Sequence, residues 1–529
     1  MTHSRTARFL AVLALAGLVA AGCTGEWPGG GTEEPVGGSD ASPRKAAAGE
    51  LAWQPCPELV DELVGDIAPS GFIEQLTARI AYECGSLTVP RDWAAPQAPG
   101  TFEIALVRAR SEDQRDRIGS LFVNPGGPGA SGIESAVYLS FGPLVGGLPA
   151  AVTDRFDVVG FDPRGVGRSS PVECFTDAEL DESFAAPPDP AGQAEFDAVV
   201  AQTREQAQTC GAEYGDTLRY FSTRQTAHDL DALRAAVGDE QLTYLGLSYG
   251  TLLGAVYAQL YPERVRALVL DGAVDPEQDA VAATEQQAAG FERALDNFAQ
   301  WCSGVPEECP LQPDARAAVT GAIEAAGADP VAGPDGRAAT DGWVFWAVVS
   351  TLYSRDAWPA LGSALEQLEG GDPRAVLALA DAYAQRSEDG SYPNIFEANS
   401  AVTCADEELG VTVPEVRGLQ QDWRADYPVF GAPLAMSLLG CVLWPGTTDP
   451  YPTGPAEGAA PILVVGTRGD PATPYESTAR LAEMLGVGVV LTWEGEGHTA
   501  YPGTDCINDA VDAYLVELTV PPEGTSCPP

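Results

Sequence analysis

Short apolar runs alternate with segments of helical periodicity along most of the chain. Strand-like runs occupy residues 80–89, 101–108, 120–123, 156–161, 242–247, 265–270, 461–466 and 487–493. Helical spacing fills residues 226–237, 249–261, 291–302, 338–353, 375–385, 475–485 and 507–518, with Thr226 as an expected N-cap. Buried strands that alternate with helices form parallel sheets covered on both faces. The pattern predicts an α/β fold with a mostly parallel sheet and an antiparallel edge formed by the first two strands.

The pattern changes after residue 275. Residues 276–440 are rich in alanine, have helical periodicity and contain few strand-like runs, and strand character returns only with the sequence PILVVG at 461–466. Ligands of open α/β sheets bind at the carboxyl edge of the strands. We therefore expect residues 276–440 to form a helical cap inserted over that edge, and residues 51–275 and 441–529 to form the two parts of the α/β core.

The N-terminus has the features of an export signal. Arg5 and Arg8 precede an apolar run at 9–21 that is too short to be a good membrane span. The run ends in LVAAGC, which resembles the lipobox of bacterial lipoproteins, although Ala20 stands where leucine is usual. We expect removal of residues 1–22, lipidation of Cys23, and a flexible tether at 23–50 on the outer face of the membrane. No other segment is long and apolar enough to cross a bilayer.

The charge and the residue counts exclude several classes of partner. The net charge of −47 argues against nucleic acid, because binding phosphates requires clustered Lys and Arg. The same charge is compatible with attraction of cationic substrates. A zinc site is not expected, because the chain has three histidines and no C-x-x-C pair.

The cysteines predict disulfide bonds. The chain has eleven, and setting Cys23 aside leaves an even number in an exported, oxidising context. Proximity in the sequence suggests, without proving, the pairs Cys56–Cys84, Cys174–Cys210, Cys302–Cys309, Cys404–Cys441 and Cys506–Cys527.

The central motif is G-x-S-x-G at 246–250, between the strand at 242–247 and the helix at 249–261. A strand that reverses into a helix within so few residues strains the backbone at Ser248. Side chains at positions 246 and 250 would collide with neighbouring elements. The motif in this setting predicts a nucleophile elbow, with the Ser248 hydroxyl raised above the sheet at the positive end of a helix.

A serine nucleophile needs a base, and the base needs an orienting acid. His498 lies in a glycine-rich loop after the last predicted strand and is the expected base, whereas His3 lies in the signal and His228 in a helix. Asp470 follows the penultimate strand and gives the chain order Ser, Asp, His. Asp271, which ends the strand at 265–270, stays an alternative acid.

The oxyanion of the reaction needs preorganised N–H donors. We expect one donor to be Tyr249, which follows the nucleophile, and the other to be Gly127, in the loop NPGGPG after the strand at 120–123. Asp162 also ends a strand, and we expect it to brace its loop through an ion pair with Arg164.

Four stretches together resemble the secreted tripeptidyl-aminopeptidase family, which belongs to the proline-iminopeptidase clan of α/β-hydrolase serine peptidases. They are NPGGPG, GFDPRGVGRSSP, GLSYGTLLGAVYAQLYPERVRALVLDG and GTRGDPATPYESTARL. The resemblance runs from about Cys56 to the C-terminus, and Pro125 stands where relatives in that clan carry a histidine. It implies an α/β-hydrolase fold with a cap, no cofactor, and cleavage of short peptides from a free N-terminus.

Such an exopeptidase also needs a carboxylate that binds the substrate ammonium. The cap sequence FEANSAVTCADEE offers Glu397, Asp406, Glu407 and Glu408. Relatives that carry the same motifs include carboxylesterases, so an esterase or lipase acting on envelope lipids is the alternative function. A catalytically silent binding lipoprotein is a third possibility, against which the complete triad argues.

Overall fold

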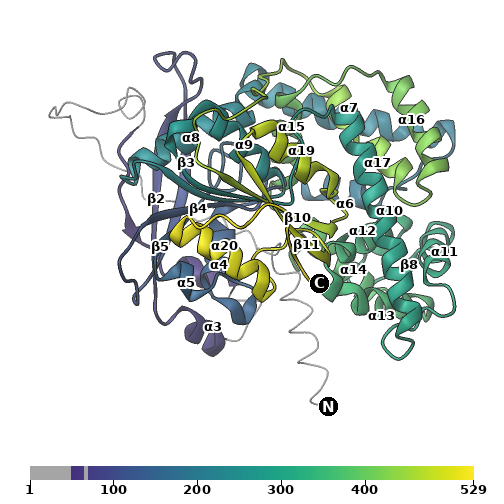
Figure 1. Ribbon diagram of the computed structural model, residues 1–529. Coiled ribbons are helices and arrows are strands. Elements are labelled where there is room, and N and C mark those ends of the chain that lie inside the picture. Colours follow the sequence, from purple (N-terminus) through teal and green to yellow (C-terminus); the bar gives the residue numbers. More distant parts are fainter. Residues whose placement is uncertain (1–48, 65–69) are drawn as a thin grey trace.

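The computed structural model describes residues 49–64 and 70–529 and contains a ten-stranded mixed sheet (Figure 1). Its spatial order is β1-β2-β3-β5-β4-β6-β7-β10-β11-β12. The strands are β1 Gln54–Pro55, β2 Ile80–Pro90, β3 Thr101–Ser111, β4 Gly119–Asn124, β5 Phe156–Phe161, β6 Leu242–Leu247, β7 Val265–Asp271, β10 Ile462–Gly469, β11 Gly488–Glu496 and β12 Thr525–Cys527. Pairing is antiparallel from β1 to β5 and parallel from β5 to β12, which confirms the predicted sheet and its antiparallel edge.

Each central strand buries both of its faces under helices. In β6, for example, Tyr244 packs in one apolar layer and Leu245 in the layer on the opposite face. The first layer contains α8 Thr223–Ala236, α9 Tyr249–Leu260 and α19 Glu476–Leu485, and the second contains α4 Gly132–Ser140, α5 Ala150–Thr153 and α20 Asp505–Glu517. These two layers make the chain an α/β-hydrolase fold and leave only the strand ends available for a site.

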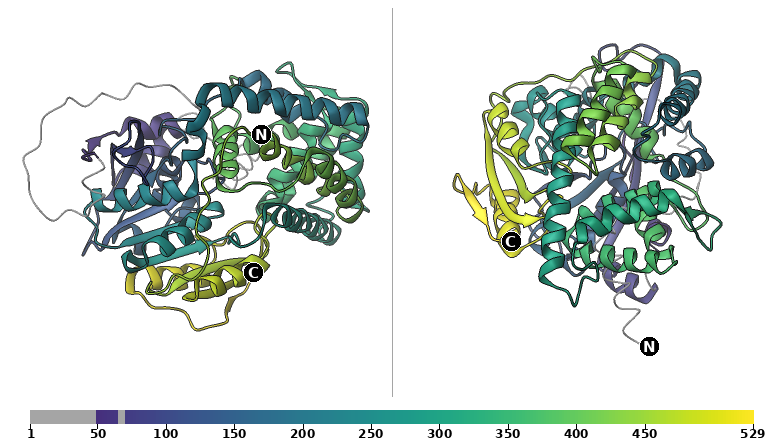
Figure 2. Two further views of the ribbon diagram at one scale, coloured as in Figure 1. Left: turned by 90° about the horizontal axis from the view of Figure 1, so that it is seen from above. Right: turned by 90° about the vertical axis from the view of Figure 1, so that its right-hand side faces the viewer.

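A block of helices separates β7 from β10, and we call it the cap. It consists of α10 Ala280–Gly304, α11 Ala315–Ala328, α12 Asp341–Leu352, α13 Trp358–Glu369, α14 Arg374–Ala384, α15 Ile395–Asp406, α16 Val413–Asp426, α17 Gly431–Ser437 and α18 Leu439–Leu443, with a small hairpin of β8 Val331–Ala332 and β9 Ala338–Ala339. The cap lies beside the sheet in the views of Figures 1 and 2.

Two helices that precede β6 extend this helical block. They are α6 Asp177–Ala185 and α7 Gln193–Tyr214. Phe184 of α6 stacks on Trp343 of α12 with ring centroids 5.5 Å apart, and Phe196 of α7 packs in the same apolar cluster as Val416 and Trp423 of α16. Part of the segment assigned to the core from sequence therefore packs with the cap.

All five predicted disulfides are present. The bonded pairs are Cys56–Cys84, Cys174–Cys210, Cys302–Cys309, Cys404–Cys441 and Cys506–Cys527. The fourth joins α15 to α18 within the cap, and the fifth ties β12 to α20 at the edge of the sheet.

The expected signal segment and Cys23 lie outside the described residues. Within 49–64 and 70–529, every helix is too short or too polar to span a bilayer.

The start of α8 differs from the prediction. Ser222, not Thr226, caps this helix, because the Ser222 hydroxyl accepts the Gln225 N–H at 3.3 Å. Thr226 lies one turn further in, where its hydroxyl donates to the Ser222 carbonyl at 3.1 Å. The helix begins earlier because carboxylates from distant segments, including Asp406, bind its first turn.

Candidate active site

Ser248 occupies a strained turn between β6 and α9. Its φ is +55° and its ψ is −125°, a combination that side-chain-bearing residues rarely adopt. A Cβ atom on Gly246 would lie 2.3 Å from the Gly250 carbonyl oxygen, and one on Gly250 would lie 2.6 Å from the Asn124 carbonyl oxygen. Both positions therefore require glycine, as the sequence predicted.

His498 and Asp470 form a hydrogen-bonded pair at the carboxyl edge of the sheet. His498 Nδ1 lies 2.9 Å from each oxygen of the Asp470 carboxylate, which is almost fully buried. A Cβ atom on Gly272 would lie 3.2 Å from His498 Cε1, and the residue before it, Asp271, accepts the Ser248 N–H at 2.8 Å. The imidazole thus lies beside the Ser248 turn, and Nε2 stays available to accept a proton.

Electrostatics favour the charged form of this imidazole. Burial lowers the pKa of His498, but the charge of Asp470, its hydrogen bond and the charge of Asp271 together raise the pKa above the usual value of 6.5. An imidazolium formed during a reaction is therefore stabilised where it lies.

Two residues that the sequence did not single out complete the setting of His498. The Thr473 hydroxyl donates to Asp470 at 3.0 Å and lies 3.3 Å from His498 Nδ1. The Tyr353 carbonyl, at the end of α12, accepts the backbone N–H of His498 at 2.8 Å. Next to this bond, Ser354 and Gly497 form an antiparallel bridge. Thr473 follows Asp470 by three residues, and this short spacing could have predicted the hydrogen bond between them. The sequence carries no sign of the contact between His498 and Tyr353.

Asp271 has a different environment from Asp470. Its Oδ2 atom accepts the N–H groups of Ala500 and Tyr501 at 2.8 and 2.7 Å, and no hydrogen bond joins its carboxylate to His498. Burial raises the pKa of Asp271 to about 7, the two N–H groups lower it and the charge of Asp470 raises it. The geometry favours Asp470 as the acid and makes Asp271 a brace for the loop that carries His498.

The structure corrects one predicted ion pair. Arg164 is fully buried and binds Asp229 of α8, with two N···O distances of 2.7 Å, instead of Asp162. Asp162 accepts the Ser131 hydroxyl at 2.6 Å and the Arg168 N–H at 2.8 Å. The N-terminus of α4, which Ser131 caps, attracts the carboxylate, so the guanidinium is free to reach α8.

The remaining described histidine is half-buried on α8. His228 Nδ1 is 2.7 Å from the Tyr261 hydroxyl, and its ring packs edge-on against Trp93. His228 is thus engaged in packing within α8 and its neighbours, in the helix where the sequence placed it.

The loop after β4 touches the Ser248 turn. A Cβ atom on Gly126 would lie 2.9 Å from Ser248 Cβ and 3.0 Å from Tyr249 N. The Gly126 N–H donates to Asn124 Oδ1 at 3.1 Å, whereas no acceptor for the Gly127 N–H occurs among the described residues. Tyr249 is the first residue of α9, so its N–H lies outside the helical ladder. The N–H groups of Gly127 and Tyr249 are thus uncommitted among the described residues, and Gly126, the residue before Gly127, packs against the Ser248 turn.

The cap contributes a row of half-buried aromatic rings to this edge. The Tyr353 ring lies edge-on to His498 at 5.3 Å, Tyr383 is 6.2 Å from Tyr353, and Phe396 of α15 is 6.4 Å from Tyr383. The next turn of α15 hydrogen-bonds the loop after β4 through Asn399. The row therefore runs from the histidine to the oxyanion loop.

The four cap carboxylates have different environments. Both oxygens of Asp406 accept hydrogen bonds from Thr223. Glu397 is buried and Glu408 is exposed. Glu407 is half-buried and accepts one long hydrogen bond of 3.4 Å, from the first residue of α10.

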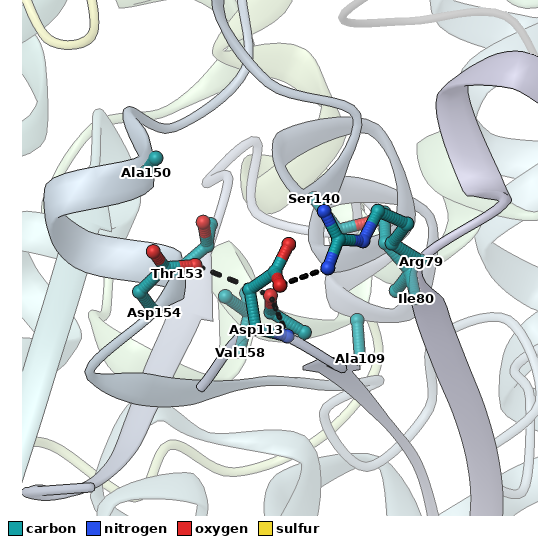
Figure 3. A pocket seen from close by; sticks show the side chains of 10 residues that line it. Arg79, Ile80, Ala109, Asp113, Ser140, Ala150, Thr153, Asp154 and Val158 are labelled. Atoms are coloured by element: carbon teal, nitrogen blue, oxygen red, sulfur yellow. Dashed lines mark hydrogen bonds and ion pairs between the residues drawn. The ribbon is translucent and has the colours of Figure 1, made fainter. Parts of the chain in front are cut away.

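A crevice of about 180 Å³ lies at the opposite edge of the sheet, near the amino end of β5 (Figure 3). Arg79 and Asp113 face one another across it as an ion pair. It contains none of the candidate catalytic residues. Over the described ranges, no group of three His, Cys, Asp or Glu side chains is arranged to hold a metal ion.

The chain is similar to known hydrolases over most of its length. Residues 427–527 match the family described as TAP-like protein. Serine protease Hip1 of Mycobacterium tuberculosis is 38% identical over 468 residues, covering 84% of this chain and 87% of that protein. Carboxylesterase B of M. tuberculosis is 35% identical over 524 residues, with 94% of each chain covered. Tripeptidyl aminopeptidase of Streptomyces lividans is 31% identical over 468 residues, with 84% of each covered. The similarity spans the sheet and the cap.

We expect Ser248→Ala and His498→Ala each to lower turnover on the order of 10⁴-fold in a folded protein, because each removes a member of the triad. The measurement is kcat/KM with a chromogenic substrate, together with labelling by a fluorophosphonate probe that Ser248→Ala abolishes. Asp470→Asn is expected to cost far more than Asp271→Asn. The reverse order, in variants with native circular dichroism, would show that Asp271 is the acid.

The acid limb of kcat/KM should lie above pH 6.5. His498 acts as a base only when neutral, and its raised pKa keeps it charged to a higher pH. Below the limb, kcat/KM should fall about tenfold per pH unit. In Asp271→Asn the limb should persist but move to lower pH, because the charge of Asp271 contributes to the raised pKa of His498. Loss of the limb in that variant would assign the titration to Asp271, and a wild-type limb below pH 6 would contradict the electrostatic argument.

Proposed function

Because the chain belongs to the TAP-like family of α/β-hydrolase serine peptidases, we propose that it is an exported aminopeptidase that releases tripeptides from the free N-termini of peptides. The observation that carries the proposal is the Asp470–His498 pair beside the Ser248 turn, with a cap residue hydrogen-bonded to the histidine loop. This arrangement supports the proposal because the cap contacts the loop that carries the proposed base.

In the proposed reaction, His498 Nε2 accepts the Ser248 hydroxyl proton while Ser248 Oγ attacks the scissile carbonyl carbon. The N–H groups of Gly127 and Tyr249 stabilise the oxyanion, and Asp470 keeps the proton on Nδ1. His498 then protonates the leaving amine as the C–N bond breaks. Water, activated by the same imidazole, hydrolyses the acyl-enzyme and restores Ser248.

The cap supports exopeptidase action because it contacts both sides of the catalytic turn. Tyr353 bonds to the His498 loop on one side, and Asn399 bonds to the oxyanion loop on the other. A tripeptide in extended form spans about 10 Å. In the proposal, a cover anchored at these two points admits only a short N-terminal segment before the scissile bond.

We assign the binding of the substrate ammonium to Glu407. Asp406 is already committed to Thr223, and Glu408 is solvated. Glu407 is half-buried and accepts one long hydrogen bond. Its neighbour Asp406 is connected to the Tyr249 side chain through the Thr223 hydroxyl. An ammonium group there would gain a charge-assisted hydrogen bond in a region with a strong negative charge.

We expect a free-amine tripeptide anilide to be cleaved a hundredfold or more faster, in kcat/KM, than its N-acetyl counterpart. Acetylation removes the charge that Glu407 binds and leaves the carboxylate unpaired, at a cost of a few kcal/mol. Single-residue anilides should be poor substrates, because their ammonium cannot reach the cap. The measurement is the initial rate on the three substrates.

Glu407→Gln should abolish the preference for the free amine, and Glu397→Gln is the matched control that should keep it. Equal rates on free and acetylated tripeptides in the wild type would exclude an amine anchor and favour an endopeptidase or an esterase.

An esterase is the second candidate function. The row of Tyr353, Tyr383 and Phe396 favours it, because apolar rings beside the base suit an acyl chain as well as a peptide side chain. Faster turnover of p-nitrophenyl esters than of every free-amine peptide would support this function.

The proposed location is the outer face of the cytoplasmic membrane, with attachment through lipid on Cys23 alone. The disulfides support an exported protein. Cys23→Ser should move the protein from the detergent-extracted fraction to the soluble fraction, because each buried acyl CH₂ contributes about 0.8 kcal/mol. Mass spectrometry that finds an unmodified mature N-terminus at another residue would refute the anchor.

A further inference from the structure

The start of α8 binds two carboxylates from segments far away in the sequence, one of them in the cap. Asp406, at the end of α15, accepts the Thr223 N–H at 2.7 Å and the Thr223 hydroxyl at 2.6 Å. Asp449, in the segment that follows the cap, accepts the Ser222 hydroxyl at 2.7 Å and pairs with Arg224. A helix N-terminus favours negative charge, so this contact docks the end of α15 onto the core.

The contact with Asp406 continues to the residue after the proposed nucleophile. The Tyr249 hydroxyl lies 2.5 Å from Thr223 Oγ1. Because the Thr223 hydroxyl donates its one hydrogen bond to Asp406, it accepts a hydrogen bond from the Tyr249 hydroxyl. All three side chains are buried. The chain of bonds therefore runs from Tyr249 through Thr223 to a carboxylate of the cap.

We propose that Thr223 and Asp406 are positioning residues that hold Tyr249, so that the oxyanion site is complete only when the end of α15 is docked. The inference rests on the proposed function, in which the Tyr249 N–H binds the oxyanion. A hydrogen bond at the far end of the Tyr249 ring fixes the direction of the side chain and limits rotation of the backbone at the start of α9.

Two observations indicate that this anchor is stiff. Cys404, two residues before Asp406, is bonded to Cys441, so the end of α15 is tied to α18. The Ala405 carbonyl also accepts the Asp449 N–H at 2.7 Å. Oxyanion stabilisation depends on donors that are placed before the reaction begins, and a small displacement costs much of their effect. A rigid anchor for Tyr249 meets that requirement.

The test compares Thr223→Val and Tyr249→Phe with Thr223→Ser. The first two remove one hydroxyl each and keep the Tyr249 N–H, whereas Thr223→Ser keeps the hydroxyl. We expect Thr223→Val and Tyr249→Phe to lower kcat about tenfold, part of the 10²–10³-fold effect of a whole oxyanion donor, with KM nearly unchanged. Thr223→Ser should restore most of the rate.

A peptide aldehyde supplies the readout that a merely structural brace would not change, because its tetrahedral adduct uses the oxyanion site. Its inhibition constant should rise by the same factor as kcat falls. Wild-type kcat and aldehyde affinity in a folded Thr223→Val protein would overturn the proposal, as would a rise in KM alone. If Thr223→Val does not fold, Tyr249→Phe decides by the same criteria.

The rate of fluorophosphonate labelling separates this inference from the proposed function. If the wild type hydrolyses esters and not peptides, the aminopeptidase proposal fails. Slower labelling and slower ester turnover in Tyr249→Phe would then still support the positioning role, and unchanged rates would overturn it.

Discussion

The strained backbone at Ser248 is the constraint on which the rest of the site depends. A side-chain-bearing residue in this conformation costs about 1–3 kcal/mol and persists only where its surroundings hold it. Here the Ser248 N–H donates to the Asp271 carbonyl, and the glycines on both sides let β4, β6 and α9 approach closely. The strain is thus balanced by the packing of the sheet itself. It fixes where the hydroxyl lies, so in the proposed mechanism the other catalytic groups must be brought to it.

Asp271 links that turn to the loop of His498, the proposed base. Its carbonyl oxygen bonds to Ser248 and its carboxylate bonds to the N–H groups of Ala500 and Tyr501 in the loop after His498. The cap supplies a second constraint on the same loop through the Tyr353 carbonyl. The imidazole is therefore positioned by the core from one side and by the cap from the other.

Local signals predicted the fold, the Ser248 turn, the strand-end position of Asp470 and the disulfide pairs. They act over a few residues, and strand ends in a parallel sheet share one edge. Long-range contacts could not be predicted. Asp271 and Asp470 both end strands, and only the path of the His498 loop distinguishes them. Arg164 pairs with Asp229 instead of Asp162 because α8 passes beside it. The cap contacts of Tyr353 and Asp406 join segments that the sequence keeps far apart.

Three buried carboxylates lower the stability of the fold near neutral pH, and two of them contact groups of the proposed active site. Burial raises the pKa of Asp271, Asp406 and Glu397 to about 7 in each case. A folded-state pKa above the unfolded value means that the folded protein binds the proton more tightly than the unfolded chain does. The contribution of each carboxyl group to the free energy of unfolding is therefore complete below about pH 4 and is lost as the pH rises through about 7. Near neutral pH these groups therefore weaken the fold as they ionise. Apolar side chains would fill the same space without that cost. Asp271 and Asp406 instead contact the loop after His498 and the Thr223 anchor of Tyr249, so carboxylates at these positions serve the geometry of the active site.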